Sequence, residues 1–118
     1  MDQNIREQLE TVGINVDEAL ERFMDNEGLM LKFLLRFAQD ENFALLRQGL
    51  EQRDAAAAYT AAHTLKGVVG NLAMKELFRM TSQVVEDLRR EDIDTAAGRM
   101  EALEAQYRRT VEVLNRLA

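Results

Sequence analysis

The chain has 118 residues, a length typical of one domain with a single hydrophobic core. It has no cysteine and one histidine, which excludes disulfides, thiolate metal sites and histidine clusters for a transition metal. A net charge of −6 at pH 7 argues against nucleic acid as the main partner, because binding there rests on clustered positive charge. With no apolar run long enough for a membrane span and no signal-peptide layout at the N-terminus, we expect a cytoplasmic protein with no membrane partner.

The composition predicts an all-α protein. Proline and tryptophan are absent, and the chain is rich in Ala, Leu, Glu, Arg and Gln, which favour helices over strands. One or two short N-terminal helices are expected, over residues 2–11, ended by Gly13, and over residues 16–24. Asn15 can cap the second helix, and Glu18 can complete a capping box with it.

Four longer helices follow, and they should form an antiparallel, up-down-up-down four-helix bundle within one domain that spans residues 1–118. Their expected bounds are about 26–52, 54–71, 73–90 and 94–117. The apolar pattern of the first helix thins at residues 39–42, so a bend or break there is compatible with the sequence. The expected N-caps of the first, second and last of these helices are Asn26, Asp54 and either Asp92 or Asp94.

The helix over 54–71 carries the single histidine, His63. At about 100° per residue, Leu65 lies about 160° from His63, and this side of the helix is the expected core face. It also holds Ala61, Val68 and Leu72. His63 therefore points away from the core. The residues within about 60° of it by the same arithmetic are Ala56, Tyr59, Thr60, Lys66, Gly67 and Gly70.

A histidine on a helix surface usually only contacts solvent, but the neighbours of His63 favour a functional role. Each glycine inside a helix costs about 1 kcal/mol relative to alanine, and Gly67 and Gly70 on the same face would let another molecule come close to the imidazole. Lys66, the only cation expected on this face, can attract an anion delivered to the ring. An exposed imidazole is largely neutral at pH 7 and has a nitrogen lone pair for attack on phosphorus. The combination indicates a phosphoryl acceptor.

The segment AAHTLKG, residues 61–67, resembles the signature of histidine-containing phosphotransfer (HPt) domains of two-component phosphorelays, and the likeness extends over roughly residues 14–90. The resemblance implies a four-helix bundle in which His63 takes a phosphoryl group from a receiver-domain aspartyl phosphate and passes it to another receiver. It also implies charge stabilisation by Lys66 and clearance for the receiver at Gly67. One departure is Ala73, where the family usually has a glycine near the turn into the next helix. Gly70 is expected to supply some of the backbone freedom that this turn needs.

The docking face for the receiver is expected to include Gly67, Gly70, Tyr59, Ala56 and Thr60. The expected partners are receiver domains of a hybrid sensor kinase or of a response regulator. No cofactor of its own and no metal site is expected, because this face has no carboxylate to hold Mg²⁺, so Mg²⁺ should belong to the partner receiver.

No glycine-rich phosphate loop is present, so the chain should have no autonomous kinase or ATPase activity. We expect a monomer, because the apolar faces of the helices are used inside the bundle. Two alternatives stay open. The same face could dock a receiver or another partner without being phosphorylated, as an adaptor module, or the chain could be a structural bundle without a partner.

Overall fold

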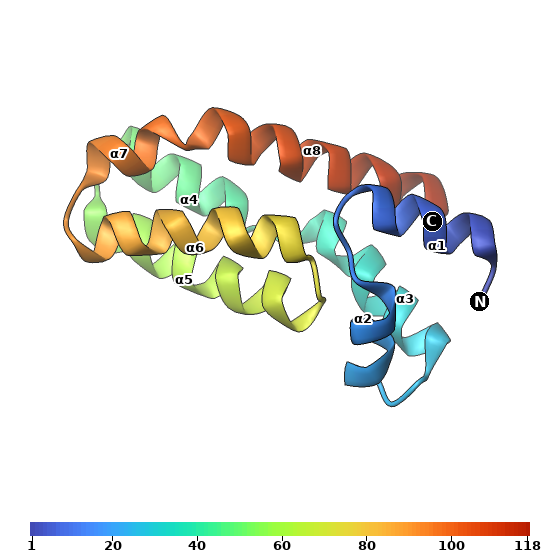
Figure 1. Cartoon of the computed structure of the whole chain (residues 1–118). Coiled ribbons are helices and arrows are strands. Elements are labelled where there is room, and N and C mark those ends of the chain that lie inside the picture. Colours follow the sequence, from blue (N-terminus) through green and yellow to red (C-terminus); the bar gives the residue numbers. More distant parts are fainter.

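The computed structural model describes residues 1–118 and contains eight α-helices, one short 3₁₀ helix and a single antiparallel bridge, with no strand. Four helices alternate in direction and form an elongated bundle, which confirms the expected all-α architecture (Figure 1). They are α4 (Asn42–Glu51), α5 (Ala55–Asn71), α6 (Lys75–Arg89) and α8 (Met100–Leu117). None of the helices is both long enough and apolar enough to cross a lipid bilayer.

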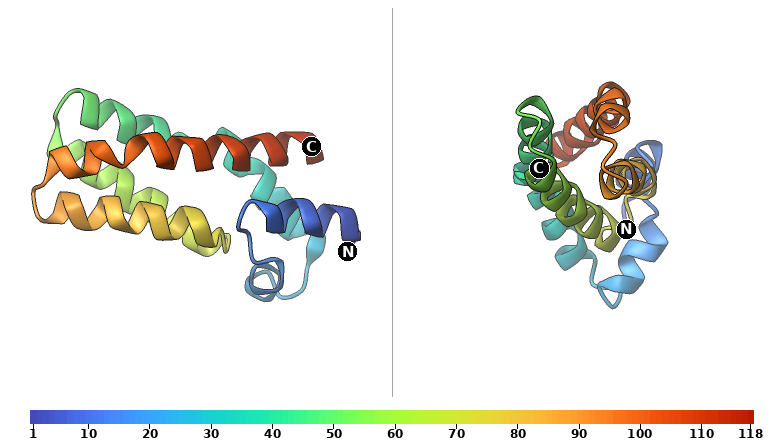
Figure 2. Two further views of the ribbon diagram at one scale, coloured as in Figure 1. Left: turned by 45° about the horizontal axis from the view of Figure 1, so that its top comes forward. Right: turned by 90° about the vertical axis from the view of Figure 1, so that its left-hand side faces the viewer.

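The N-terminal third of the chain covers one end of this bundle. It forms α1 (Gln3–Thr11), α2 (Val16–Arg22) and α3 (Glu27–Arg36). The C-terminal half of α8 extends past α5 and α6 toward this end, where it contacts α1 and α3 (Figures 1 and 2). Of the one or two short N-terminal helices expected, both form, although α2 ends before Met24, which has a positive φ of 55°.

Helix starts follow the expected capping residues. Asn15, Asn26, Asp54 and Asp92 each accept a hydrogen bond from a backbone N–H three residues ahead. The expected capping box at Glu18 does not form. The N–H of Asn15 donates to the carbonyl oxygen of Ala73 at 2.9 Å, and the Glu18 carboxylate pairs instead with Arg22 and Lys75, at 2.9 Å in each case.

The prediction of one helix over residues 26–52 is wrong. After α3 the chain forms a 3₁₀ helix, η1 (Phe37–Gln39), and Asp40 is then extended, with ψ of 136°. The Asp40 carboxylate accepts hydrogen bonds from the backbone and side-chain N–H groups of Asn42, at 2.8 and 3.0 Å. A short polar side chain that bonds to nearby backbone N–H groups competes with the helical hydrogen bonds, and here it separates α3 from α4.

The buried apolar side chains form one hydrophobic core. The inner face of α5 consists mostly of small residues, namely Ala58, Ala61, Ala62, Leu65 and Val69. Val68, which was expected in the core, is only half-buried, and Val69 is buried in its place. At Gly49 of α4 a Cβ atom would lie 2.8 Å from the backbone nitrogen of Ala58, so glycine is required for the two helices to pack this closely.

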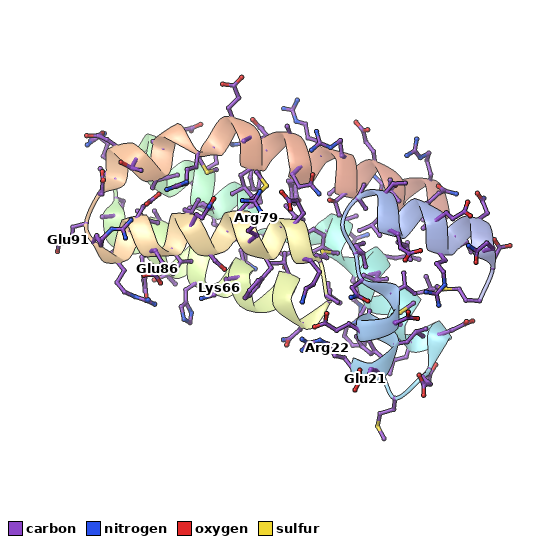
Figure 3. The ribbon with its side chains drawn as sticks, viewed as in Figure 1. Glu21, Arg22, Lys66, Arg79, Glu86 and Glu91 are labelled. Atoms are coloured by element: carbon purple, nitrogen blue, oxygen red, sulfur yellow. The ribbon has the colours of Figure 1, made fainter.

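Several helices end in a left-handed residue that is not glycine. Arg53, Ala73 and Glu91, with φ between 53° and 61°, follow the last turns of α4, α5 and α6 (Glu91 is labelled in Figure 3). The turn after α5 thus forms with Ala73 at the position where the resemblance leads us to expect glycine. Gly70 lies inside α5 without a positive φ, so the expectation that it supplies the freedom of this turn is wrong.

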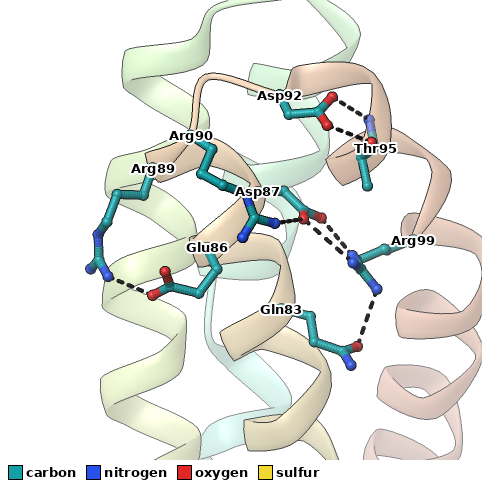
Figure 4. Close-up of polar contacts among 8 residues, drawn as sticks. All are labelled: Gln83, Glu86, Asp87, Arg89, Arg90, Asp92, Thr95 and Arg99. Carbon is teal, nitrogen blue, oxygen red and sulfur yellow. Dashed lines mark hydrogen bonds and ion pairs between the residues drawn. The ribbon is translucent and has the colours of Figure 1, made fainter.

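Residues 94–117 were expected to form one helix, but α7 (Ile93–Gly98) is divided from α8 at Arg99. Gly98 weakens the helix locally, and the Arg99 guanidinium reaches across to the carboxylate of Asp87 on α6 (Figure 4). Asp87 is fully buried and also pairs with Arg90 at 3.0 Å. A buried carboxylate strongly requires its partners, so Asp87 fixes the position of Arg99 and hence the start of α8.

Replacing Glu91 with glycine should stabilise the fold, because Glu91 is exposed, makes no ion pair and has a φ of 61°. Glycine removes the penalty for a left-handed backbone, roughly 1–2 kcal/mol. Its greater conformational entropy in the unfolded state opposes this gain by about 0.5–1 kcal/mol. We therefore expect the free energy of unfolding, measured by urea denaturation, to rise by roughly 0.5–1 kcal/mol. The Glu91→Ala variant is the matched control, since it removes the carboxylate but keeps the strain. Equal stability of the two variants would contradict the strain at this position.

Candidate functional site

His63 lies in the middle of α5 and its side chain is exposed, on the side that helical arithmetic predicts. The opposite face of the helix is buried in the core. The imidazole is 5.8 Å from the ring of Tyr59, measured between centroids, with the ring planes at 31°. His63 forms no ion pair within the chain. The imidazole is therefore accessible to solvent and is not held by a carboxylate of the same chain.

A groove of about 370 Å³ opens beside His63. Its walls are the second half of α5, the turn after it, the start of α6, and Arg22 from α2. In Figure 3, Arg22 lies beside the C-terminal end of α5, and Lys66 lies farther back along that helix. We call it the histidine groove, and the residues that line it are Arg22, His63, Lys66, Gly67, Val69, Gly70, Asn71, Ala73, Met74, Lys75 and Phe78.

Lys66 follows His63 by about one helical turn and lines the same groove. Its side chain is half-buried, and the Nζ atom lies 5.8 Å from the centroid of the Phe78 ring, a cation–π contact. Lys66 has no ion pair within the chain. Its ammonium group thus contacts an aromatic ring of the groove, and no carboxylate of the chain pairs with its charge.

The two glycines of the groove have different surroundings. A Cβ atom added at Gly67 would meet nothing within 4 Å, so the space in front of this residue is open. A Cβ atom added at Gly70 would lie 3.2 Å from two atoms of the Phe78 ring. Gly70 therefore has a packing role inside the chain, because it lets Phe78 lie against α5, whereas Gly67 leaves the surface next to His63 flat.

The other three residues of the expected docking face lie outside the histidine groove. Ala56 and Thr60 line a separate groove, between α4 and α5. Tyr59 is half-buried on the side of α6, where its hydroxyl oxygen accepts a hydrogen bond from Nη2 of Arg89 at 3.3 Å. Of the residues expected around His63, the structure brings together Lys66, Gly67 and Gly70 in one groove.

Lys66 is not the only cation beside His63, contrary to the sequence-based expectation. Arg22 of α2 and Lys75 of α6 line the same groove. Both are held by Glu18, whose pKa is lowered below its ordinary value by the hydrogen bonds from Lys75 and Arg22. Nothing in the local spacing of the sequence indicates that α2 and α6 meet here, so helical periodicity could not reveal these two cations.

The site offers a nucleophile and cations but no ligand set for a metal. None of the residues that line the histidine groove is Asp or Glu. Nowhere in the chain do three or more His, Cys, Asp or Glu side chains lie close enough to hold a metal ion. The chemistry that this groove can support with its own residues is therefore attack by the imidazole on an electrophile that carries negative charge.

A comparison with protein families gives one match. The family model described as Hpt domain matches residues 30–113, which is more than two thirds of the chain. The matched region contains His63, Lys66 and both groove glycines, and it excludes α1 and α2. No curated protein and no solved structure gives a significant match to the chain.

Alanine should have different effects at the two groove glycines. Gly67→Ala should raise the free energy of unfolding by about 1 kcal/mol, because alanine is the better helix former and its methyl group meets no other atom. Gly70→Ala should gain less than this or lose stability, because its methyl group would press on Phe78. The free energies of unfolding of both variants and of the wild type are measured by urea denaturation. Equal gains at the two positions would show that Phe78 does not pack against Gly70.

Proposed function

We propose that this chain, which belongs to the Hpt domain family, is a phosphorelay intermediate that carries its phosphoryl group on His63. Histidine phosphotransfer in two-component phosphorelays is the role of this family, and its partners are receiver domains. The observation that carries the assignment of His63 is its exposed imidazole at the centre of α5, with Lys66 and the open surface at Gly67 one turn away.

The proposed reaction is a direct exchange of one bond to phosphorus for another. A nitrogen lone pair of His63 attacks the phosphorus atom of a receiver aspartyl phosphate, and the P–N bond forms as the bond from phosphorus to the carboxylate oxygen breaks. The aspartate leaves as a carboxylate with the electron pair, and the positive charge on the imidazole is relieved by loss of the other ring proton to solvent. Transfer to a second receiver is the reverse, with an aspartate carboxylate as the nucleophile.

The residues around His63 support this reaction by position and charge. Phosphoryl transfer is catalysed mainly by alignment and by stabilisation of charge on the phosphoryl oxygens. Lys66, free of any carboxylate partner, can supply part of that charge, and the bare backbone at Gly67 lets the donor approach the ring in line. The remaining charges, including Mg²⁺ and the carboxylates that hold it, are assigned in this proposal to a receiver of a hybrid sensor kinase or a response regulator.

His63→Gln should abolish phosphoryl uptake while leaving the fold unchanged, because an exposed side chain contributes little to packing. The assay incubates the chain with a panel of receiver domains that were phosphorylated with acetyl phosphate and then freed of it. Intact mass should show one added phosphoryl group on the wild type, labile in acid and stable in base, and none on the variant. Circular dichroism and the melting temperature serve as the folding control. Labelling of the variant at the wild-type rate would exclude His63 as the carrier, and no labelling of either chain would favour the adaptor alternative.

Gly67→Gln should slow transfer by about tenfold to a hundredfold, because a long side chain then occupies the open surface over which the donor must approach. Gly67→Ala is the matched control, since it gains similar helix propensity but adds only a methyl group. Single-turnover transfer rates from a phosphorylated receiver provide the measurement. Lys66→Ala should slow the same step less than His63→Gln does. If Gly67→Gln and Gly67→Ala transfer at equal rates, approach over Gly67 is not part of the mechanism.

A further inference from the structure

The helix α2 is part of the histidine groove although it lies outside the region that matches the family model. Its position is fixed by a short antiparallel bridge between Ile14 and Met74, both buried. Two backbone hydrogen bonds of 2.9 Å complete the bridge, from Asn15 N–H to Ala73 and from Lys75 N–H to Gly13. The start of α2 is therefore attached to the turn between α5 and α6, which places Arg22 at the groove.

Glycine at position 13 is required for this attachment. Its φ is +83°, and a Cβ atom there would lie 2.8 Å from the Cβ atom of Glu76. Any other residue would both strain the backbone and push α1 and α2 away from the start of α6. The contact between α2 and the groove is thus built into the backbone and does not depend on surface ion pairs alone.

The charge of the groove is opposite to the charge of the whole chain. The chain carries 21 acidic and 15 basic residues, for a net charge of −6. The lining of the groove nevertheless contains three cations, Arg22, Lys66 and Lys75, and no acidic residue. Glu18 pairs with both Arg22 and Lys75 from outside the lining, so these three side chains together keep an excess of one positive charge.

We propose that Arg22 and Lys75 form an electrostatic docking site for the anionic surface around the phosphorylation site of a receiver domain; this inference rests on the proposed function. A domain that binds Mg²⁺ does so largely through carboxylates, and the phosphoryl group adds further negative charge. A partner with this surface is repelled by most of a chain of net charge −6 and attracted by the groove. The pair Arg22 and Lys75 thereby orients the receiver toward His63, and α2 contributes to the choice of receiver.

The test measures receiver binding apart from phosphoryl transfer. All variants are made in the His63→Gln chain, and the equilibrium dissociation constant for a receiver phosphorylated with acetyl phosphate is measured by titration. Arg22→Ala and Lys75→Ala should each weaken binding by roughly two- to fivefold, the size expected for an exposed charge pair. The effect should fade between about 0.01 M and 1 M salt, over which the Debye length falls from about 30 Å to about 3 Å.

Two control variants separate docking from structural support. Arg108→Ala removes an arginine from a similar Glu–Arg pair, with Glu104 on α8, outside the groove, and should leave binding unchanged. Glu18→Gln removes the carboxylate that holds Arg22 and Lys75 but keeps both cations, so binding should be equal to or tighter than that of the parent chain.

The possible outcomes distinguish this inference from the proposed function. If Arg22→Ala binds as Arg108→Ala does, or if Glu18→Gln weakens binding as much as Arg22→Ala, the docking role is refuted. Failure of every receiver to bind the parent chain refutes it as well. If receivers bind with the expected dependence on Arg22 and Lys75 while the wild-type chain takes up no phosphoryl group, the docking site stands and the transfer function fails.

Discussion

The close approach of α4 and α5 at Gly49 and Ala58 is the constraint that positions the functional helix. With no Cβ atom at Gly49, the two helices meet through their backbones, and the small side chains of α5 let that helix lie deep between α4 and α6. One face of α5 is therefore enclosed by its neighbours, and the opposite face remains for solvent. His63 is at the centre of that face, so the proposed phosphoryl carrier is exposed on a helix whose other face is packed in the core. This arrangement suits phosphoryl transfer, which depends on alignment more than on covalent help from the protein.

The histidine groove is built from residues of three helices, α2, α5 and α6. His63 and Lys66 belong to α5, which packs against both α4 and α6, while Phe78 of α6 contacts the lysine through its ring and lies against Gly70. Arg22 comes from α2, a helix of seven residues that is attached by its buried residues Val16 and Ala19, by the backbone bridge before it and by ion pairs. In the proposed function the reacting group therefore lies on α5, whereas the two docking cations lie on α2 and α6.

The parts of the structure that depend on neighbours in sequence could be predicted, and the parts that depend on distant contacts could not. Helix caps and the exposed side of His63 follow from residues within one turn, and the structure confirms them. The break at Asp40 was visible only as a thinning of the apolar pattern, because the deciding hydrogen bonds to Asn42 compete with helical ones of similar strength. The sequence does not reveal that Arg22 lines the groove, because the bridge between Ile14 and Met74 that places α2 there leaves no periodic pattern. At Gly70 the sequence predicts clearance for a partner, because it shows the cost of a helical glycine but not the Phe78 ring that fills the space.

The bridge between the segments 13–15 and 73–75 also gives the groove a reporter of its own motions. The amide protons of Asn15 and Lys75 are covered by these two hydrogen bonds, so they exchange with deuterium when α2 separates from the turn after α5. Such local openings require less free energy than unfolding of the core, and amides inside α5 exchange mainly through the rarer global event. In deuterium oxide, the exchange rate of the Asn15 and Lys75 amides, divided by the rate of the same amides without protection, therefore gives the fraction of time for which the groove lacks its α2 wall.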